Sequence, residues 1–107
     1  MTGDDGFCVV LTTVADADEA RRLAGGMVRK GLAACVQAIP MQSVYLWQGE
    51  IEEADEVLLL VKTRRARYHD VERFITAEHS YDVPEVVCLP VAAGLSAYLA
   101  WIHDATA

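Results

Sequence analysis

The chain has 107 residues, a hydrophobic fraction of 53% and a formal net charge of -7. Its length is typical of a single domain, and its negative charge opposes a phosphate backbone, so we expect no nucleic-acid partner. The start of the chain is acidic and no apolar run approaches the ~20 residues that span a bilayer, so we expect a cytoplasmic protein without a membrane segment.

A buried strand followed by a helix is predicted first. Residues 7–14 are mostly apolar and β-branched, which favours a strand. Asp16 is a candidate N-cap, and Glu19 three residues later completes a capping-box pattern. Lys30 and Gly31 place a cation and a helix-stopping glycine at the other end. We therefore expect a helix between Asp16 and Gly31.

A long β-hairpin is predicted in the middle of the chain. Residues 32–39 form a second strand, which Pro40 is expected to interrupt, and this proline indicates a bend or a sheet edge. Residues 43–63 then read as the two arms of one hairpin, and the apolar side chains of these arms require cover on both faces. A chain of this length has too few elements to supply that cover. We therefore expect another copy of the chain to cover the hairpin.

The second half of the chain repeats the order of the first. A helical stripe over residues 68–79 is followed by a strand at 85–91 and an amphipathic helix over 95–102. The resulting order, βαββαβ plus a terminal helix, predicts an α+β, ferredoxin-like sandwich with both crossover helices on one face of an antiparallel sheet. Residues 1–6 are expected to be a flexible N-terminus and residues 7–107 a single domain.

Signals of catalysis are absent from the sequence pattern. There is no glycine-rich phosphate loop and no recognisable nucleophile motif, so we expect no enzyme. His79 is the histidine of most interest, because it ends a helix just before Tyr81 and Glu85, and these three side chains are expected to converge. A metal or small-anion contact is one interpretation of His79, and a helix-terminal histidine favoured by the macrodipole is the other.

Aromatic side chains and one lysine are further candidates. Tyr45 and Trp47 are typical of a subunit interface and less typical of a ligand pocket. Lys62 ends an apolar strand, where its ammonium group needs either water or an anion. An intersubunit ion pair and a ligand contact both remain open for Lys62.

Five segments together resemble the CutA divalent-cation tolerance family. They are LAACV at 32–36, SVYLWQGEI at 43–51, LLLVKT at 58–63, HSYDVPEV at 79–86 and YLAWI at 98–102. The five occur in order with matching separations, and the resemblance runs from about Phe7 to His103. It implies a ferredoxin-like subunit in a homotrimer, similar in architecture to the PII signalling proteins, with the hairpin reaching a neighbouring subunit.

The resemblance also implies a role in tolerance to copper and other divalent metals. Some family members are described as binding copper through a cysteine at the end of the first strand and two adjacent histidines. The matching positions here are Thr12, Glu78 and His79, so one imidazole remains. Because copper prefers thiolate and imidazole ligands, the resemblance implies weak copper binding at His79 and Glu78 or a shift toward harder ions.

Three functions remain open at this point. The first is a trimeric binding protein for divalent metal ions, copper in particular, that needs no metal to fold. The alternative is a PII-like trimeric sensor that binds a small anionic or organic ligand in the cleft between subunits, with His79 and the pocket residues Trp47, Lys62, Tyr81 and Glu85. A structural trimer that anchors another protein is the third.

Overall fold

The computed structural model describes residues 5–107; residues 1–4, which belong to the predicted flexible N-terminus, lie outside the described residues. The elements follow the predicted order. They are β1 (Phe7–Val14), α1 (Ala17–Arg29), β2 (Cys35–Trp47), β3 (Glu50–Arg64), a short 3-10 helix (Arg65–Arg67), α2 (Tyr68–Glu78), β4 (Val87–Pro90) and α3 (Ser96–Ala105).

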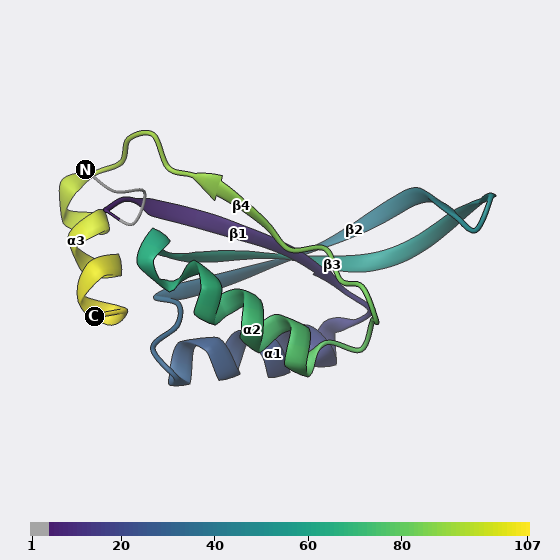
Figure 1. Ribbon diagram of the computed structural model, residues 1–107, viewed down its shortest axis with the longest axis horizontal. Helices are drawn as coiled ribbons and strands as arrows, with labels where there is room; N and C mark the ends of the chain where they lie inside the picture. Colours follow the sequence, from purple (N-terminus) through teal and green to yellow (C-terminus); the bar gives the residue numbers. More distant parts are fainter. Residues whose placement is uncertain (1–4) are drawn as a thin grey trace.

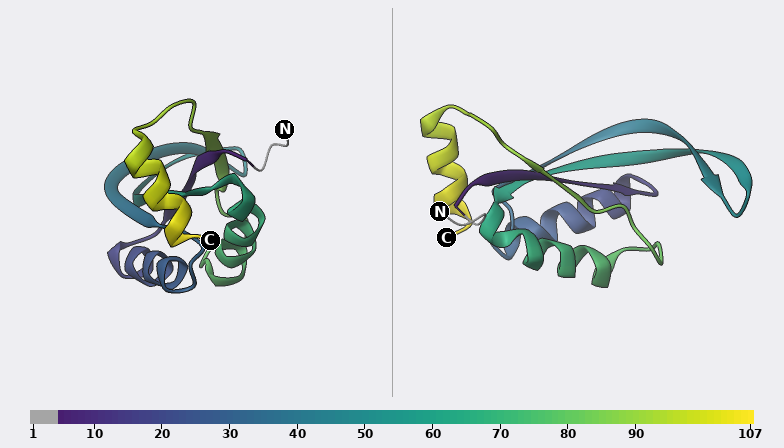
Figure 2. Two further views of the ribbon diagram at one scale, coloured as in Figure 1. Left: turned by 90° about the vertical axis from the view of Figure 1, so that its left-hand side faces the viewer. Right: turned by 45° about the horizontal axis from the view of Figure 1, so that its top comes forward.

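The four strands form one antiparallel sheet in the order β2-β3-β1-β4. Helices α1 and α2 lie side by side on one face of this sheet, and α3 packs at the end of the sheet where β1 begins (Figures 1 and 2). This is the predicted ferredoxin-like sandwich with an additional C-terminal helix. Among the described residues, none of the helices is long and apolar enough to cross a membrane.

The start of α1 confirms the predicted N-cap. The Asp16 Oδ1 atom accepts a hydrogen bond from the Glu19 N–H at 2.8 Å. The Glu19 carboxylate in turn accepts a hydrogen bond from the N–H of Ala15, one residue before the cap, at 3.2 Å. The helix ends at Arg29, and two residues later Gly31 has a φ of 70°, the left-handed conformation that glycine adopts without strain.

The hydrophobic core lies between the sheet and the two crossover helices. Alternate side chains of β1 and β3 point toward the helices because successive strand residues face opposite sides. The fully buried members are Val10, Val14, Leu59 and Val61 from the sheet, and Leu23, Met27, Val71 and Ile75 from the helices. The opposite face of the sheet has no helix across its centre (Figure 1).

The hairpin is longer than the helix layer that supports it. Its arms stay in register from Cys35 opposite Lys62 to Trp47 opposite Glu50. Gln48 and Gly49 connect the arms with φ angles of 51° and 82°, the two positive values that a tight two-residue hairpin turn requires. The far half of the hairpin therefore projects beyond the domain, as Figures 1 and 2 show.

The predicted bounds of the second and last strands were wrong, and the second strand begins at Cys35, not at residue 32. Pro40 does not interrupt the second strand, since β2 runs through it and pairs it with Val57. β2 is an edge strand, where one side of the backbone has no neighbour in the sheet and a missing N–H is tolerated. The last strand begins at Val87, not at residue 85, because its pairing with β1 begins at Val87 opposite Leu11.

Candidate functional site

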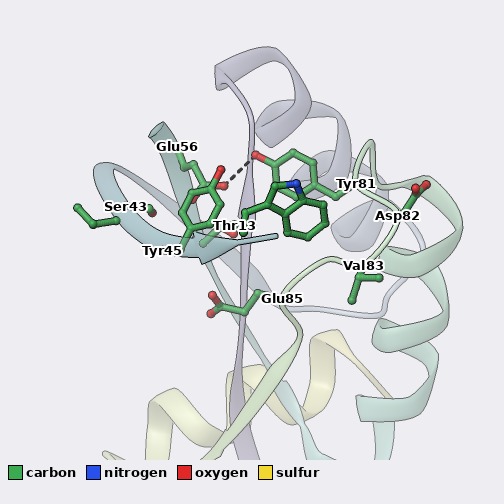
Figure 3. A pocket seen from close by; sticks show the side chains of 10 residues that line it. Thr13, Ser43, Tyr45, Glu56, Tyr81, Asp82, Val83 and Glu85 are labelled. Atoms are coloured by element: carbon green, nitrogen blue, oxygen red, sulfur yellow. Dashed lines mark hydrogen bonds between the residues drawn. The ribbon is translucent and has the colours of Figure 1, made fainter. Parts of the chain in front are cut away.

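A pocket of about 560 Å³ lies beneath the hairpin, a volume typical of sites that bind small molecules. It is bounded by β1, both hairpin arms and the loop between α2 and β4 (Figure 3). Its lining residues are Thr13, Ser43, Val44, Tyr45, Trp47, Glu56, Tyr81, Asp82, Val83 and Glu85.

Strand geometry explains which hairpin residues line the pocket, except for Val44, which lies between Ser43 and Tyr45 in the strand. Ser43, Tyr45 and Trp47 alternate along β2 and so lie on one face of the hairpin. Glu56 pairs with Met41 in the antiparallel register and therefore shares that face. The β2–β3 hairpin thus contributes aromatic, hydroxyl and carboxylate groups to a single surface.

A hydrogen bond joins the hairpin to the loop on the far side of the pocket. The Tyr81 hydroxyl donates to Glu56 Oε2 at 2.8 Å, the contact drawn as a dashed line in Figure 3. Burial, the hydrogen bond and the charge of Glu56 raise the pKa of Tyr81 to about 12. The phenol therefore stays protonated near neutral pH and remains the donor in this bond.

The electrostatic character of the pocket is acidic. Glu56, Asp82 and Glu85 supply three carboxyl groups, and none of the lining residues is Lys, Arg or His. The sequence explains this charge, because no Lys or Arg occurs between Lys30 and Lys62. The pocket therefore favours a positively charged occupant over a negatively charged one.

His79 lies behind the pocket and its side chain is fully buried. Its Nε2 atom is 2.7 Å from the Thr13 carbonyl oxygen, and its Nδ1 atom accepts the Tyr81 N–H at 3.0 Å. A carbonyl only accepts and a backbone N–H only donates, so these partners assign the neutral tautomer with the proton on Nε2. Both ring nitrogens are thus occupied by backbone partners, and the imidazole fixes two pocket residues.

Glu19 fixes the same loop from the side of α1, although the sequence pattern identified it only as a capping residue. Its carboxylate accepts from the Ser80 N–H at 2.8 Å and from the Ser80 hydroxyl at 2.9 Å. Burial by itself raises the pKa of this carboxyl, but the hydrogen bonds from Ser80 and Ala15 outweigh it and hold the pKa below its usual value. Nothing in the local sequence pairs Glu19 with Ser80.

The positions matched to metal ligands by the resemblance do not converge. Thr12 is buried on the core face of β1, and its Oγ1 atom has no hydrogen-bond partner among the described residues. Glu78 is half exposed and its Oε1 atom lies 3.3 Å from the Arg22 guanidinium. Within residues 5–107, no three His, Cys, Asp or Glu side chains gather as a set of metal ligands.

The four residues predicted for a ligand pocket separate into two places. Trp47, Tyr81 and Glu85 line the pocket, whereas Lys62 does not. The Lys62 ammonium nitrogen lies 5.5 Å from the centre of the Tyr98 ring, a cation–π contact. Sequence reasoning did not assign Ser43, Glu56 and Asp82 to the pocket, although the strand alternation that placed Tyr45 and Trp47 on one face also applied to Ser43.

Comparison with known proteins places the chain in one family. The profile described as "CutA1 divalent ion tolerance protein" matches residues 8–105. The "Divalent-cation tolerance protein CutA" of Thermus thermophilus is 44% identical over 99 residues, which cover 92% of this chain and 96% of that protein. The chloroplastic CutA of Arabidopsis thaliana is 39% identical over 92% of this chain, but this match spans only 54% of the plant protein.

Solved structures agree with the sequence matches. A structure described as a periplasmic divalent cation tolerance protein CutA from Archaeoglobus fulgidus superimposes with a TM-score of 0.93 at 35% identity, covering 94% of this chain and 99% of that one. CutA1 from Oryza sativa gives a TM-score of 0.93 at 37% identity, covering 99% and 98% of the two chains.

Proposed function

The chain belongs to the CutA1 divalent ion tolerance family, and we propose that it acts in divalent-cation tolerance as a homotrimeric binding protein without catalytic activity. The observation that carries the proposal is the exposed apolar surface of the hairpin. Val44, Leu46 and Ile51 are 68%, 71% and 77% exposed in the single chain. Exposed apolar residues gathered on a projecting element mark a protein–protein contact.

The geometry of the hairpin supports assembly with copies of the same chain. The outer strands β2 and β4 have unpaired edges within the described sheet, and the face opposite α1 and α2 exposes further apolar side chains. Ile39, Val87 and Leu89 are each 44% to 49% exposed. A neighbouring subunit would cover the unpaired strand edges and the exposed apolar face together. The family resemblance gives the number of subunits as three.

The residues present do not fit a copper site at His79 and Glu78. The His79 ring has no free nitrogen for a metal, because Thr13 and Tyr81 occupy both. The hydroxyl of Thr12 stands where a thiolate ligand is found in copper-binding members, and a hydroxyl is a poor ligand for copper. We therefore assign His79 a structural role and propose no copper chemistry at this position.

A second candidate function is a trimeric sensor of a small organic ligand. The pocket beneath the hairpin favours it, since Trp47, Tyr81 and Glu85 come from distant parts of the chain and line one cavity. The loop on its far side is held by His79 and Glu19, so the cavity is formed without a ligand. In this proposal, divalent-cation tolerance is the cellular outcome and the pocket is the binding site.

The proposed function is tested by growth under metal stress. A host strain that lacks its own CutA-type protein is grown at increasing concentrations of copper(II) while it expresses the wild type or the double variant Leu46→Glu/Ile51→Glu. We expect the wild type to raise the tolerated concentration and the double variant, whose hairpin cannot be covered by a neighbour, to lose the effect. A wild type that gives no more tolerance than the empty vector contradicts the proposal.

A further inference from the structure

We infer that the pocket beneath the hairpin binds a small organic cation, an amine or ammonium group carried on a short carbon skeleton. The inference deepens the second candidate function, because it rests on the proposal that this pocket is a ligand site. Three independent properties of the cavity carry it: its charge, its aromatic walls and its fixed shape.

The charge of the pocket has no internal counterion. Glu56, Asp82 and Glu85 line it, and no lining residue carries positive charge. All nine Lys and Arg residues lie within two stretches, 21–30 and 62–73, so neither residues 43–56 of the hairpin nor the pocket loop contains one. An anionic occupant meets uncompensated repulsion there, whereas a cation gains from each carboxylate.

The aromatic walls distinguish an organic cation from a bare metal ion. Tyr45, Trp47 and Tyr81 contribute rings to the lining, and ring faces attract ammonium groups while they also cover a carbon skeleton. A hard divalent ion instead requires a close shell of oxygen ligands. No group of three acidic, histidine or cysteine side chains in residues 5–107 provides such a shell.

The shape of the cavity is set before any ligand arrives. The Tyr81 hydroxyl donates a hydrogen bond to Glu56, and the Tyr81 backbone N–H donates one to the buried His79 ring. Ser80, the neighbouring residue, is held by two hydrogen bonds to Glu19. A pocket whose walls are already fixed loses little conformational entropy on binding, which raises the affinity for a small ligand.

The experiment compares four probes by isothermal titration calorimetry at pH 7.5. Butane-1,4-diamine and choline are organic cations, and butane-1,4-diol and succinate are the neutral and anionic counterparts of the diamine. We expect the wild-type protein to bind a cation at least about tenfold more tightly than the diol and to give no heat with succinate. Raising NaCl from roughly 20 to 300 mM should weaken the binding of the cation, because the Debye length falls to about 6 Å and the carboxylates are screened.

Matched variants locate the site. Glu56→Gln and Glu85→Gln should each lower the affinity for the cation about tenfold, since each removes one negative charge from the lining. The amide oxygen that Glu56→Gln introduces can still accept the Tyr81 hydrogen bond, so the wall of the pocket is preserved. Glu53→Gln is the control, because Glu53 lies on the opposite face of the hairpin and does not line this pocket.

Three outcomes overturn the inference: no heat from either cation up to about 10 mM, succinate binding as tightly as the diamine, or cation binding that both glutamine variants leave unchanged. Sedimentation equilibrium of the same samples separates this test from the proposed assembly. A trimer that binds no cation refutes the ligand class alone, whereas a monomer that binds one refutes the trimer alone.

Discussion

Two buried polar side chains, His79 and Glu19, hold the loop that forms one wall of the pocket. His79 was a functional candidate because a histidine at a helix end near a tyrosine and a glutamate is typical of a site. The sequence does not reveal whether the partners of a ring nitrogen are backbone groups or a ligand. That choice depends on β1, which supplies the Thr13 carbonyl from a distant part of the chain.

The Glu19 carboxylate should make the stability of the protein depend on pH. Its pKa is lowered in the folded state from an ordinary value of 4.5. Such a carboxyl contributes stability that is present above its unfolded pKa and is lost as the pH falls through the folded pKa. Glu19→Gln should therefore lower the free energy of unfolding by about 1 to 2 kcal/mol near pH 7. Ala15 and Ser80 then donate to a neutral amide oxygen, which is a weaker acceptor than the charged carboxylate.

Urea unfolding at a fixed protomer concentration between pH 7 and pH 3 measures this effect. The difference between wild type and Glu19→Gln should shrink below about pH 4.5. Glu78→Gln is the control, because Glu78 is half exposed and its pair with Arg22 is solvent-screened. A difference between wild type and Glu19→Gln that stays constant down to pH 3 would show that the charge of Glu19 is not involved.

The packing of α1 against α2 depends on one of two adjacent glycines in α1. A Cβ atom at Gly26 would lie 2.6 Å from Cζ of Phe74, a ring on α2 that packs against the core. A Cβ atom at Gly25 meets only the end of the flexible Arg29 side chain. Local sequence reasoning predicts the helix around both glycines but cannot distinguish them, since Phe74 belongs to another helix.

Alanine substitution of the two glycines should therefore have opposite effects. Gly25→Ala should stabilise the protein by up to about 1 kcal/mol, the usual gain when alanine replaces glycine inside a helix. Gly26→Ala should destabilise it by about 1 to 3 kcal/mol. The new methyl group forces the Phe74 ring to move, and the cost of that overpacking exceeds the gain in helix propensity. Thermal unfolding of both variants checks the prediction, and an equal stabilisation by both would contradict the packing argument.

The strands show the same division between local and distant information. The hairpin was predictable because its alternation and its apolar second arm are local patterns, and the Gln48–Gly49 turn agrees with them. Pro40 predicted a bend or a sheet edge, and the local pattern could not decide between them. The structure has the edge, through which β2 continues, because strand order is a property of the whole sheet.

Across the molecule, the two faces of the projecting hairpin carry different chemistry. Tyr45 and Glu56 face the pocket, whereas Leu46 and Ile51 are paired on the other face and are exposed. Substitution of Leu46 and Ile51 can therefore disturb the proposed subunit contact on that face without changing a residue of the pocket lining. The bare sheet face was predicted from the order of the elements, and three of the four predicted pocket residues line the cavity. The rest of its lining was not predictable, because the pocket forms only where the hairpin meets the Tyr81 loop.

The double variant Leu46→Glu/Ile51→Glu should dissociate the proposed trimer. Two carboxylates placed opposite each other on the contact face must lose their hydration when a neighbour covers them, and this cost opposes association. Sedimentation equilibrium at micromolar concentration should give the mass of three chains for the wild type and of one chain for the variant. Val28→Glu is the control, since Val28 is 45% exposed on α1, away from the hairpin.

The thermal unfolding of the same proteins adds a second measurement. If assembly stabilises the fold, the wild-type Tm should rise with protein concentration, and the Tm of the double variant should be lower and independent of concentration. The Val28→Glu protein should behave as the wild type does, because the helix layer takes no part in the proposed contact. A wild type that sediments as a monomer or dimer, or a double variant that remains a trimer, would show that the apolar face of the hairpin does not hold three chains together.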